Sequence, residues 1–157
     1  MPATLASGSE LNLVELYDVV EALRRGHFDR RISAGGLTGR AGMVARTLNA
    51  TMEMLETFKA EQLRIANEIG TRGELGCTME VFDATGGWLE MVDAINRMST
   101  GLTVELRRTS QATAALAQGD TSKRLTSELI GGEVAAMQGH LNEVADRLAR
   151  SSHARPA

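Results

Sequence analysis

The chain contains very little proline, and that scarcity is the first clue to its fold. Only Pro2 and Pro156 are present among 157 residues, one near each end. Proline breaks helices because it lacks an N–H and its ring clashes with the preceding turn, so nearly the whole chain is free of the strongest helix breaker. Alanine, leucine, methionine, glutamate and arginine, which favour helices, are abundant. The composition therefore predicts an all-α protein.

Other scarcities exclude whole classes of function. Aromatic residues make up 3% of the chain and the net charge is −3, so neither base stacking nor a basic stripe for nucleic acid is expected. Cys77 is the single cysteine, which rules out an internal disulfide and suggests a small apolar side chain in a reducing compartment. No apolar run reaches the roughly 18 residues of a membrane span, and the first residues lack the pattern of a signal peptide. We therefore expect a cytoplasmic protein whose membrane association, if any, runs through a partner or a missing region.

Chemistry-bearing patterns are also scarce. None of the three histidines, His27, His140 and His153, is followed by the acidic residue typical of a kinase phosphoacceptor. No histidine, cysteine or carboxylate pair has metal-ligand spacing. The segment "AGGLTGRAG" (34–42) lacks the Gly-Lys-Ser/Thr ending of a phosphate-binding loop and is interpreted as a connector. We expect no catalytic residue, no metal, no cofactor and no enzymatic activity.

The chain instead contains a repeat. Gly26, Gly73 and Gly119 are followed, 23 residues later in each case (49−26, 96−73, 142−119), by an asparagine: Asn49, Asn96 and Asn142. The intervening segments align without a gap. A further glycine lies ten residues before each asparagine, and an aliphatic residue lies directly before it. A repeat of this period predicts three copies of one supersecondary unit.

Each copy is predicted to consist of helix, connector and helix. In the first copy, Leu13, Leu16, Val19, Val20 and Leu23 form an apolar stripe with helical spacing, and Gly26 ends the helix. The connector spans about 27–40, and the second helix starts near Ala41. Because 41–69 and 88–117 contain no proline, the second helix of one copy is expected to continue as the first helix of the next. The predicted units are 10–58, 59–104 (divergent) and 105–150, between disordered ends at 1–9 and 151–157.

A connector of about 14 residues is long enough to return along a short helix, whereas an antiparallel hairpin needs only about 2–8, so the two helices should run parallel. Two helices bury one face each, and pairing two chains would close a four-helix bundle. The predicted positions fall into three groups. Those for the bundle core or dimer interface are Leu16, Val19, Leu23, Val44, Leu48, Leu55, Leu63, Met91, Ile95, Leu102, Leu116, Met137, Leu141 and Leu148. Those for connector anchors and turns are Gly26, Phe28, Ile32, Gly73, Leu75, Met79, Gly119 and Leu125. Those for the start of the second helix are Gly39, Gly86, Trp88, Gly132 and Glu133, with Trp88 preferred as a core anchor over a ligand contact.

These residues give the chain a resemblance to the HAMP domain family. The resemblance covers about residues 10–150 and rests on three features. These are the first helix that ends at a glycine, the connector with spaced apolar residues, and the segments "RTLNATMEML" and "DAINRMSTGL" in the second helices. The resemblance implies parallel homodimeric four-helix bundles that relay signals in bacterial sensor kinases and chemoreceptors. Three copies would form a tandem array. Two features depart from the family: no first helix contains proline, and only Glu133 supplies the acidic residue common at the start of the second helix.

Two functions from different classes follow as hypotheses. The first is a signal relay in a two-component or chemotaxis system, a homodimer that also associates with the HAMP helices of a histidine kinase or chemoreceptor. The alternative is a coiled-coil dimerisation scaffold that does not switch. The junctions between copies differ by one residue (73−49 = 24, 119−96 = 23), which is about 100° of helix rotation. The two junctions are therefore expected to differ in helix phase, and a one-residue deletion between Thr57 and Ala66 should change the output.

Overall fold

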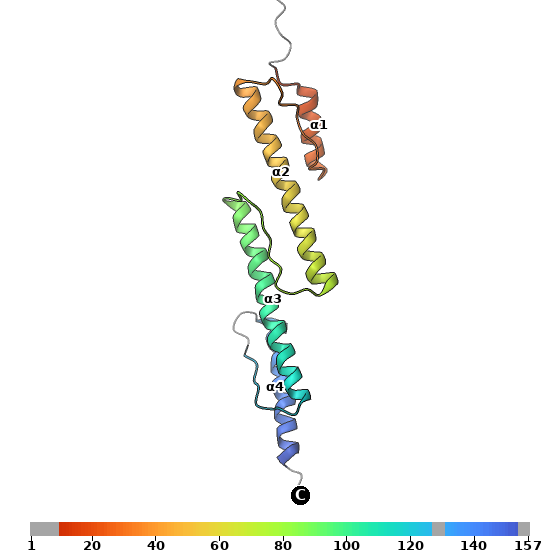
Figure 1. The fold of residues 1–157 in the computed structure, drawn as a ribbon, viewed down its shortest axis with the longest axis vertical. Helices are drawn as coiled ribbons and strands as arrows, with labels where there is room; N and C mark the ends of the chain where they lie inside the picture. Colours follow the sequence, from red (N-terminus) through yellow and green to blue (C-terminus); the bar gives the residue numbers. More distant parts are fainter. Residues whose placement is uncertain (1–9, 127–130, 154–157) are drawn as a thin grey trace, which may run out of the picture. The chain divides into compact units, whose positions relative to one another are not determined.

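The computed structural model describes residues 10–126 and 131–153, and all regular structure in them is helical. The elements are α1 (Leu13–Arg24), α2 (Gly39–Asn67), the π-helical turn η1 (Glu68–Arg72), α3 (Gly87–Ala117) and α4 (Gly132–His153) (Figure 1). The prediction of an all-α protein is confirmed for this part of the chain. The predicted tail from 151 needs correction, because α4 extends to His153. The predicted disorder of 1–9 and 154–157 lies outside the described residues.

The described chain forms two compact units. The first extends to Arg64 and includes Val81–Asp83, whereas the second comprises Ile65–Glu80 and the chain from Ala84 onward. The first repeat lies in the first unit. The connectors and second helices of the other two repeats lie almost entirely in the second.

Helix α1 has well-defined ends that follow from its sequence. Asn12 caps its start, because its Oδ1 accepts from the N–H groups of Val14 (3.0 Å) and Glu15 (3.3 Å). At the other end, Gly26 has φ +80°, its N–H donates to Leu23, and the next N–H donates to Ala22 at 2.9 Å. This pair of bonds is the Schellman arrangement, and its left-handed residue favours glycine. The helix therefore ends where the sequence predicted.

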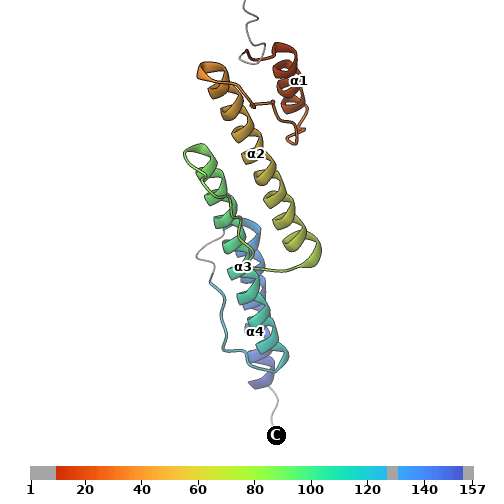
Figure 2. The same cartoon turned by 45° about the horizontal axis from the view of Figure 1, so that its top comes forward.

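The first unit is built around a small apolar core between α1, the connector and α2. Val19, Ile32, Leu37, Ala45 and Met52 are buried there, with Leu16, Leu23 and Leu48 among the partly buried residues around them. The connector passes so close to α2 that a Cβ on Gly42 would lie 2.5 Å from the carbonyl oxygen of Leu37. Figures 1 and 2 show that the connector returns along the pair and that α2 then runs in the same direction as α1. The parallel arrangement predicted from the connector length is thus present in the first repeat.

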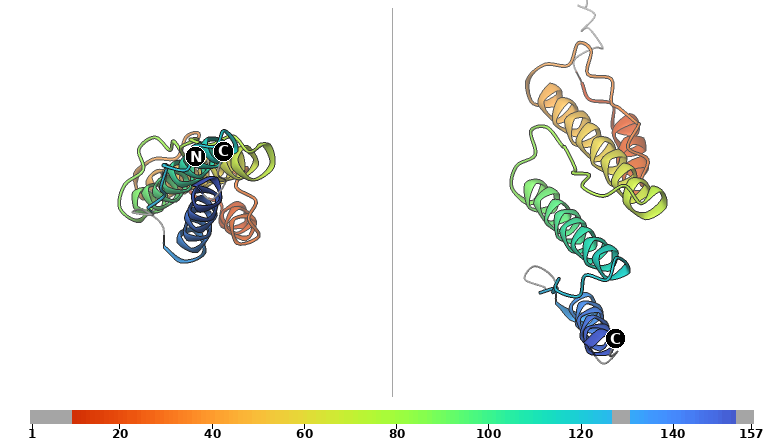
Figure 3. Two further views of the ribbon diagram at one scale, coloured as in Figure 1. Left: turned by 90° about the horizontal axis from the view of Figure 1, so that it is seen from below. Right: turned by 60° about the horizontal axis from the view of Figure 1, so that its bottom comes forward.

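In the second unit, the connector before α3 lies along that helix and runs opposite to it (Figure 3). Met79, Cys77 and Leu75 contact Asn96, Ser99 and Arg107 in turn. Helix α3 is continuous over 31 residues, so the second helix of the middle repeat and the first helix of the third are one helix, as predicted. Helix α4 packs against the C-terminal half of α3 (Figure 2).

The expected phase difference between the two junctions needs correction. Nine and sixteen residues after the asparagine, the first junction buries Phe58 and Ile65, and the second buries Glu105 and Ala112. The burial phase is therefore the same in both. The additional residue of the first junction is accommodated later, in η1, where the N–H of Glu74 bonds to the carbonyl of Glu68 six residues earlier. In the third repeat the equivalent bond, from Asp120 to Ala115, spans five residues. A π turn holds one more residue than an α turn, so the insertion does not rotate the preceding helix.

Candidate functional site

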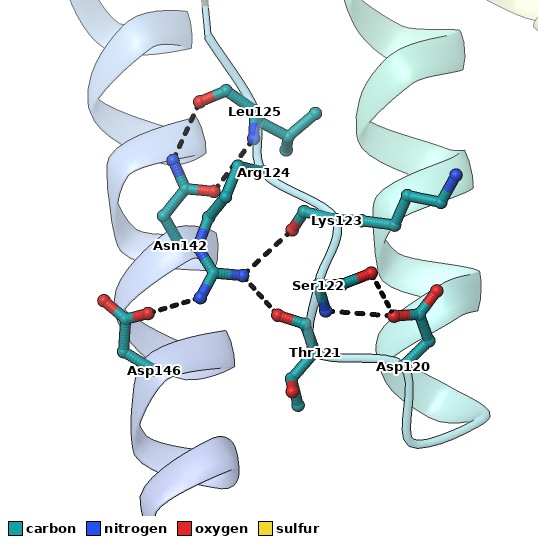
Figure 4. A network of polar contacts seen from close by, with 8 residues as sticks. All are labelled: Asp120, Thr121, Ser122, Lys123, Arg124, Leu125, Asn142 and Asp146. Atoms are coloured by element: carbon teal, nitrogen blue, oxygen red, sulfur yellow. Dashed lines mark hydrogen bonds and ion pairs between the residues drawn. The ribbon is translucent and has the colours of Figure 1, made fainter.

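The asparagine of each repeat fastens the connector to the second helix with the same pair of hydrogen bonds. The N–H of Ile32 donates to Asn49 Oδ1 at 2.8 Å, and Asn49 Nδ2 donates back to the carbonyl of Ile32 at 2.9 Å. Asn96 binds Met79 in the same way (2.6 and 3.1 Å), as does Asn142 with Leu125 (2.9 and 2.8 Å; Figure 4). A primary amide offers an acceptor and donors in one plane, so it can pair with both backbone groups of a single residue. This asparagine clamp explains why asparagine recurs with fixed spacing.

The clamped residue is also the apolar anchor of each connector. Ile32, Met79 and Leu125 are 3%, 2% and 8% exposed, respectively. The clamp satisfies their backbone groups where water is excluded, while their side chains fill the space between connector and helix. Of the other residues predicted in the connectors, Phe28 and Leu75 are half-buried. Each repeat therefore has a buried anchor at the sixth residue after its glycine, and the first connector also buries Leu37.

Arginine strengthens the connector in the first and third repeats, a role that was not predicted from the sequence. Arg31 Nη1 donates to the carbonyls of Phe28 (2.5 Å) and Arg30 (2.9 Å), and its Nη2 pairs with Glu56 at 2.9 Å. In the third repeat, Arg124 bonds to the equivalent carbonyls of Thr121 and Lys123 and pairs with Asp146 at 2.6 Å (Figure 4). The recurrence of arginine five residues after the glycine was the available signal.

The middle repeat replaces this arginine with Thr78 and satisfies the same carbonyls from the helix instead. Ser99 Oγ donates to the carbonyl of Cys77 at 2.6 Å, and Arg107 Nη2 donates to that of Leu75 at 3.1 Å. The donors thus come from α3 and not from the connector itself. This difference in polar contacts sets the middle repeat apart structurally, in agreement with its divergent sequence.

Two carboxylates in the helix exits have shifted pKa values. Hydrogen bonds from Arg24, at 2.7 and 2.6 Å, hold the pKa of Glu21 below its usual value. The side-chain and backbone bonds of Ser122 lower the pKa of Asp120 (Figure 4). Glu21 is half-buried and Asp120 is exposed, and both are bonded within their own turns, which suits a structural role at the helix ends.

The second helices carry an apolar stripe that the chain leaves partly uncovered. It occupies four positions in each repeat, at five and one residues before the asparagine and two and six after it. We call these positions the uncovered stripe: Val44, Leu48, Thr51 and Leu55 in α2; Met91, Ile95, Met98 and Leu102 in α3; and Met137, Leu141, Val144 and Leu148 in α4. Val44, Met91 and Met137 are 47%, 42% and 38% exposed, and Met98 is 57% exposed. A groove of about 940 Å³ lies against α3 here, and its lining includes Met98, Gly101 and Leu102.

The predicted residues of the bundle core or dimer interface differ in how deeply they are buried within the chain. Val19 is buried inside the first unit, and most others are partly buried. The exposed members are Val44, Leu63, Met91, Met137 and Leu148. Val144 was not among the predicted positions, although its spacing of three residues from Leu141 continues the pattern. Met98, three residues after Ile95, continues it in the same way and is 57% exposed.

The residues predicted at the start of the second helix mark the helix ends. Helices α2 and α4 begin at Gly39 and Gly132, Gly86 directly precedes α3, and all three have positive φ. Trp88 is half-buried in the first turn of α3, and Glu133 is exposed in the first turn of α4. A carboxylate there interacts favourably with the positive end of the helix dipole.

Histidine, cysteine and acidic side chains are dispersed over the described residues. No group of three or more histidine, cysteine or acidic residues among them is placed to hold a metal ion. His27 and His140 are exposed, and the side chain of His153 lies outside the described part. Within that same part, no helix combines the length and apolar character required to cross a membrane.

The most regular surface of the chain is thus the uncovered stripe, repeated in register on helices whose connectors are clamped in place. Comparison with known proteins adds no assignment, because no protein-family model and no solved structure matches the chain.

Proposed function

We propose that the chain is a signal-relay module built from three HAMP-like repeats. Two chains would associate in parallel through the uncovered stripe, and each repeat would form a four-helix bundle with its partner. A conformational change at one end would then pass along the continuous helices to the other. The module itself catalyses no reaction.

The observation that carries this proposal is the uncovered stripe. Its spacing of four, three and four residues is that of a coiled-coil seam, and it recurs at the same positions in all three repeats. Eleven of its twelve residues are apolar, the exception being Thr51. Contiguous apolar surface of this kind marks an interaction site, because its exposure to water is unfavourable. Each such side chain that becomes fully buried contributes on the order of 1 kcal/mol to association.

Continuous helices supply the mechanical link. Since α3 is shared between the second and third repeats, a rotation or displacement of α3 in one repeat also moves it in the next. A packed bundle tends to occupy discrete arrangements, so an input that favours one arrangement shifts the population of both repeats. The clamped connectors would hold each helix pair together while the interface between chains changes.

Light scattering after size-exclusion chromatography tests the association. The proposal expects a dimer at micromolar concentration, and a monodisperse monomer would contradict the architecture. Parallel alignment is tested with single cysteines at Leu48 and Leu55, in a Cys77→Ser background. Equivalent positions of the two chains should form disulfide crosslinks.

The alternative function is a dimeric scaffold with one fixed packing. Fusing the chain between a receptor input and a kinase output distinguishes it from a relay. A relay passes the stimulus, changes its crosslinking pattern at Leu48 and Leu55, and loses or inverts its output when Ala60 is deleted. A scaffold shows the same crosslinks with and without the stimulus. Association with the HAMP helices of a sensor kinase or chemoreceptor belongs to the relay hypothesis and is tested by crosslinking in the same fusion.

A further inference from the structure

A buried polar pair joins α3 to α4, at two positions that are both apolar in the first repeat. Gln138 Nε2 donates to Glu105 Oε2 at 2.5 Å, and both residues are only 1% exposed. Glu105 lies nine residues after its asparagine, where the first repeat has Phe58. Gln138 lies four residues before its asparagine, where the other repeats have Ala45 and Val92. Polar residues thus replace hydrophobic ones on both sides of one contact.

Within the described structure, the hydrogen-bonding capacity of this pair is not fully used. Neither Glu105 Oε1 nor Gln138 Oε1 has a hydrogen-bond partner there. The guanidinium of Arg108 is 44% exposed, and its Nη1 lies 3.9 Å from Glu105 Oε1. Among the residues that the structure describes, Gln138 is therefore the sole side chain that donates a hydrogen bond to this carboxylate. Burying a carboxylate costs free energy that rises steeply if its remaining donor is removed.

The opposite face of α3 is held by different contacts. Thr103 is 5% exposed, and Arg107 donates to the carbonyl of Leu75 in the preceding connector. A Cβ added to Gly76 would lie 3.9 Å from Thr103 Cγ2 and 3.4 Å from Arg107 Nη2, so the connector and helix are close here. Two residues correspond to about 200° around a helix, which places Thr103 and Glu105 on opposite sides. One turn of α3 therefore contacts the second connector on one side and α4 on the other.

We propose that the hydrogen bond between Glu105 and Gln138 is a polar latch that sets the rotational position of α3 against α4. Apolar side chains tolerate small rotations, because dispersion and hydrophobic contacts have little directionality. A hydrogen bond to a buried carboxylate does not tolerate such rotations, since it weakens steeply outside a narrow range of distance and angle. Buried polar contacts can specify register in this way at a cost in stability. The latch follows from this geometry alone and does not depend on the proposed relay.

A double-mutant cycle on the full chain tests the energetic part. Gln138→Met leaves the carboxylate without its donor, so the folding equilibrium constant should fall by about 10- to 100-fold. Glu105→Met should also reduce it. The double substitution to methionine should bring the constant back to within about threefold of the unaltered protein, or above it, because apolar replacement of a buried charged pair is often neutral or stabilising. Gln111→Met, at an exposed position of α3, is the matched control and should change little. Additive effects of the two single substitutions would overturn the proposal.

A distance measurement tests the rotational part. Spin labels at Gln111 on α3 and Glu143 on α4, in a Cys77→Ser background, report the relative setting of these helices. The double methionine variant should fold but give a broader distance distribution than the unaltered pair. Glu105→Gln keeps a hydrogen-bonding side chain of the same shape, so it should retain the narrow distribution. An equally narrow distribution in the double variant would show that packing alone sets the rotation.

Discussion

Single residues fasten each connector, and the asparagine clamp is the clearest case. Asn49, Asn96 and Asn142 each satisfy both backbone groups of one buried residue seventeen positions earlier. A longer amide or a carboxylate would not reproduce this planar, two-way pairing. The clamp accounts for the most regular spacing in the sequence.

Replacing a clamp asparagine with aspartate should destabilise its repeat. Asn142→Asp keeps the acceptor for the N–H of Leu125 but removes the donor to its carbonyl and places negative charge beside it. The free energy of unfolding should fall by about 1–3 kcal/mol, measured by urea denaturation. Asn67→Asp, on the exposed face at the end of α2, is the control. Equal effects of the two substitutions would show that the clamp contributes no specific stability.

Two glycines should respond in opposite ways to alanine. The Cβ of Gly42→Ala would meet the backbone of Leu37 at 2.5 and 2.9 Å, so the connector must move at a cost of about 1–3 kcal/mol. Gly139 has open space around it within α4, and its replacement with alanine should stabilise the protein by about 0.5–1 kcal/mol. Thermal unfolding of both variants measures the contrast. A neutral Gly42→Ala would mean that the connector is free to shift.

At the scale of elements, the helix exits determine how the repeats join. The first and third connectors leave their helices through a Schellman end, whereas the middle one follows a π turn. The π turn allows a helix with one additional residue to reach an equivalent exit without changing its buried face. The length difference between the junctions is therefore a local feature of η1.

Deleting Gly70 should convert η1 into an α-helical end like that of the third repeat. The fold should persist, and the free energy of unfolding should rise by about 1 kcal/mol, because a glycine is removed from a helical segment. Deleting Ala60 instead rotates Ile65, which is 4% exposed, by about 100° out of its buried position. That change should cost about 1.5–3 kcal/mol. Thermal unfolding followed by circular dichroism compares the stability of the two deletion variants. A larger loss of stability from the Gly70 deletion would contradict the role given to η1.

At the scale of the whole molecule, the uncovered stripe is a repeated apolar surface that the described chain leaves partly exposed. Twelve positions on three helices share one pattern and remain partly exposed. The repeats supply internal packing through their connectors, and we propose that the stripe serves for association. This division of roles underlies the proposed dimer.

Association through the stripe should make stability depend on concentration. The thermal midpoint of a dimer rises with protein concentration, because mass action favours the folded, associated state. Ile95→Asp places a charge at the centre of the stripe on α3 and should lower the midpoint and remove this dependence. Gln111→Asp, at an exposed position outside the stripe on the same helix, should leave it intact. A concentration-independent midpoint in the unaltered chain would contradict association through the stripe.

Much of the architecture was contained in the sequence. The lack of proline, the apolar stripes and the glycine and asparagine spacing predicted the helices, their ends and the three repeats. These features are local or periodic, so each is visible in a short segment. Ile32, Met79 and Leu125 were expected as connector anchors for the same reason, because they are apolar residues within polar segments.

Other features were determined only by the tertiary structure. Several polar contacts join residues 20 or more positions apart. They include the ion pairs of Arg31 and Arg124, the bonds from Ser99 and Arg107 that replace those arginines in the middle repeat, and the pairing of Glu105 with Gln138. The π turn likewise depends on how the chain accommodates one additional residue. The spacing of the repeats showed which junction contains this residue but not the backbone conformation that accommodates it. Sequence periodicity determines which face of a helix is apolar. The fold determines which polar groups meet across that face, because hydrogen bonds require distances and directions that arise only when the elements are packed together.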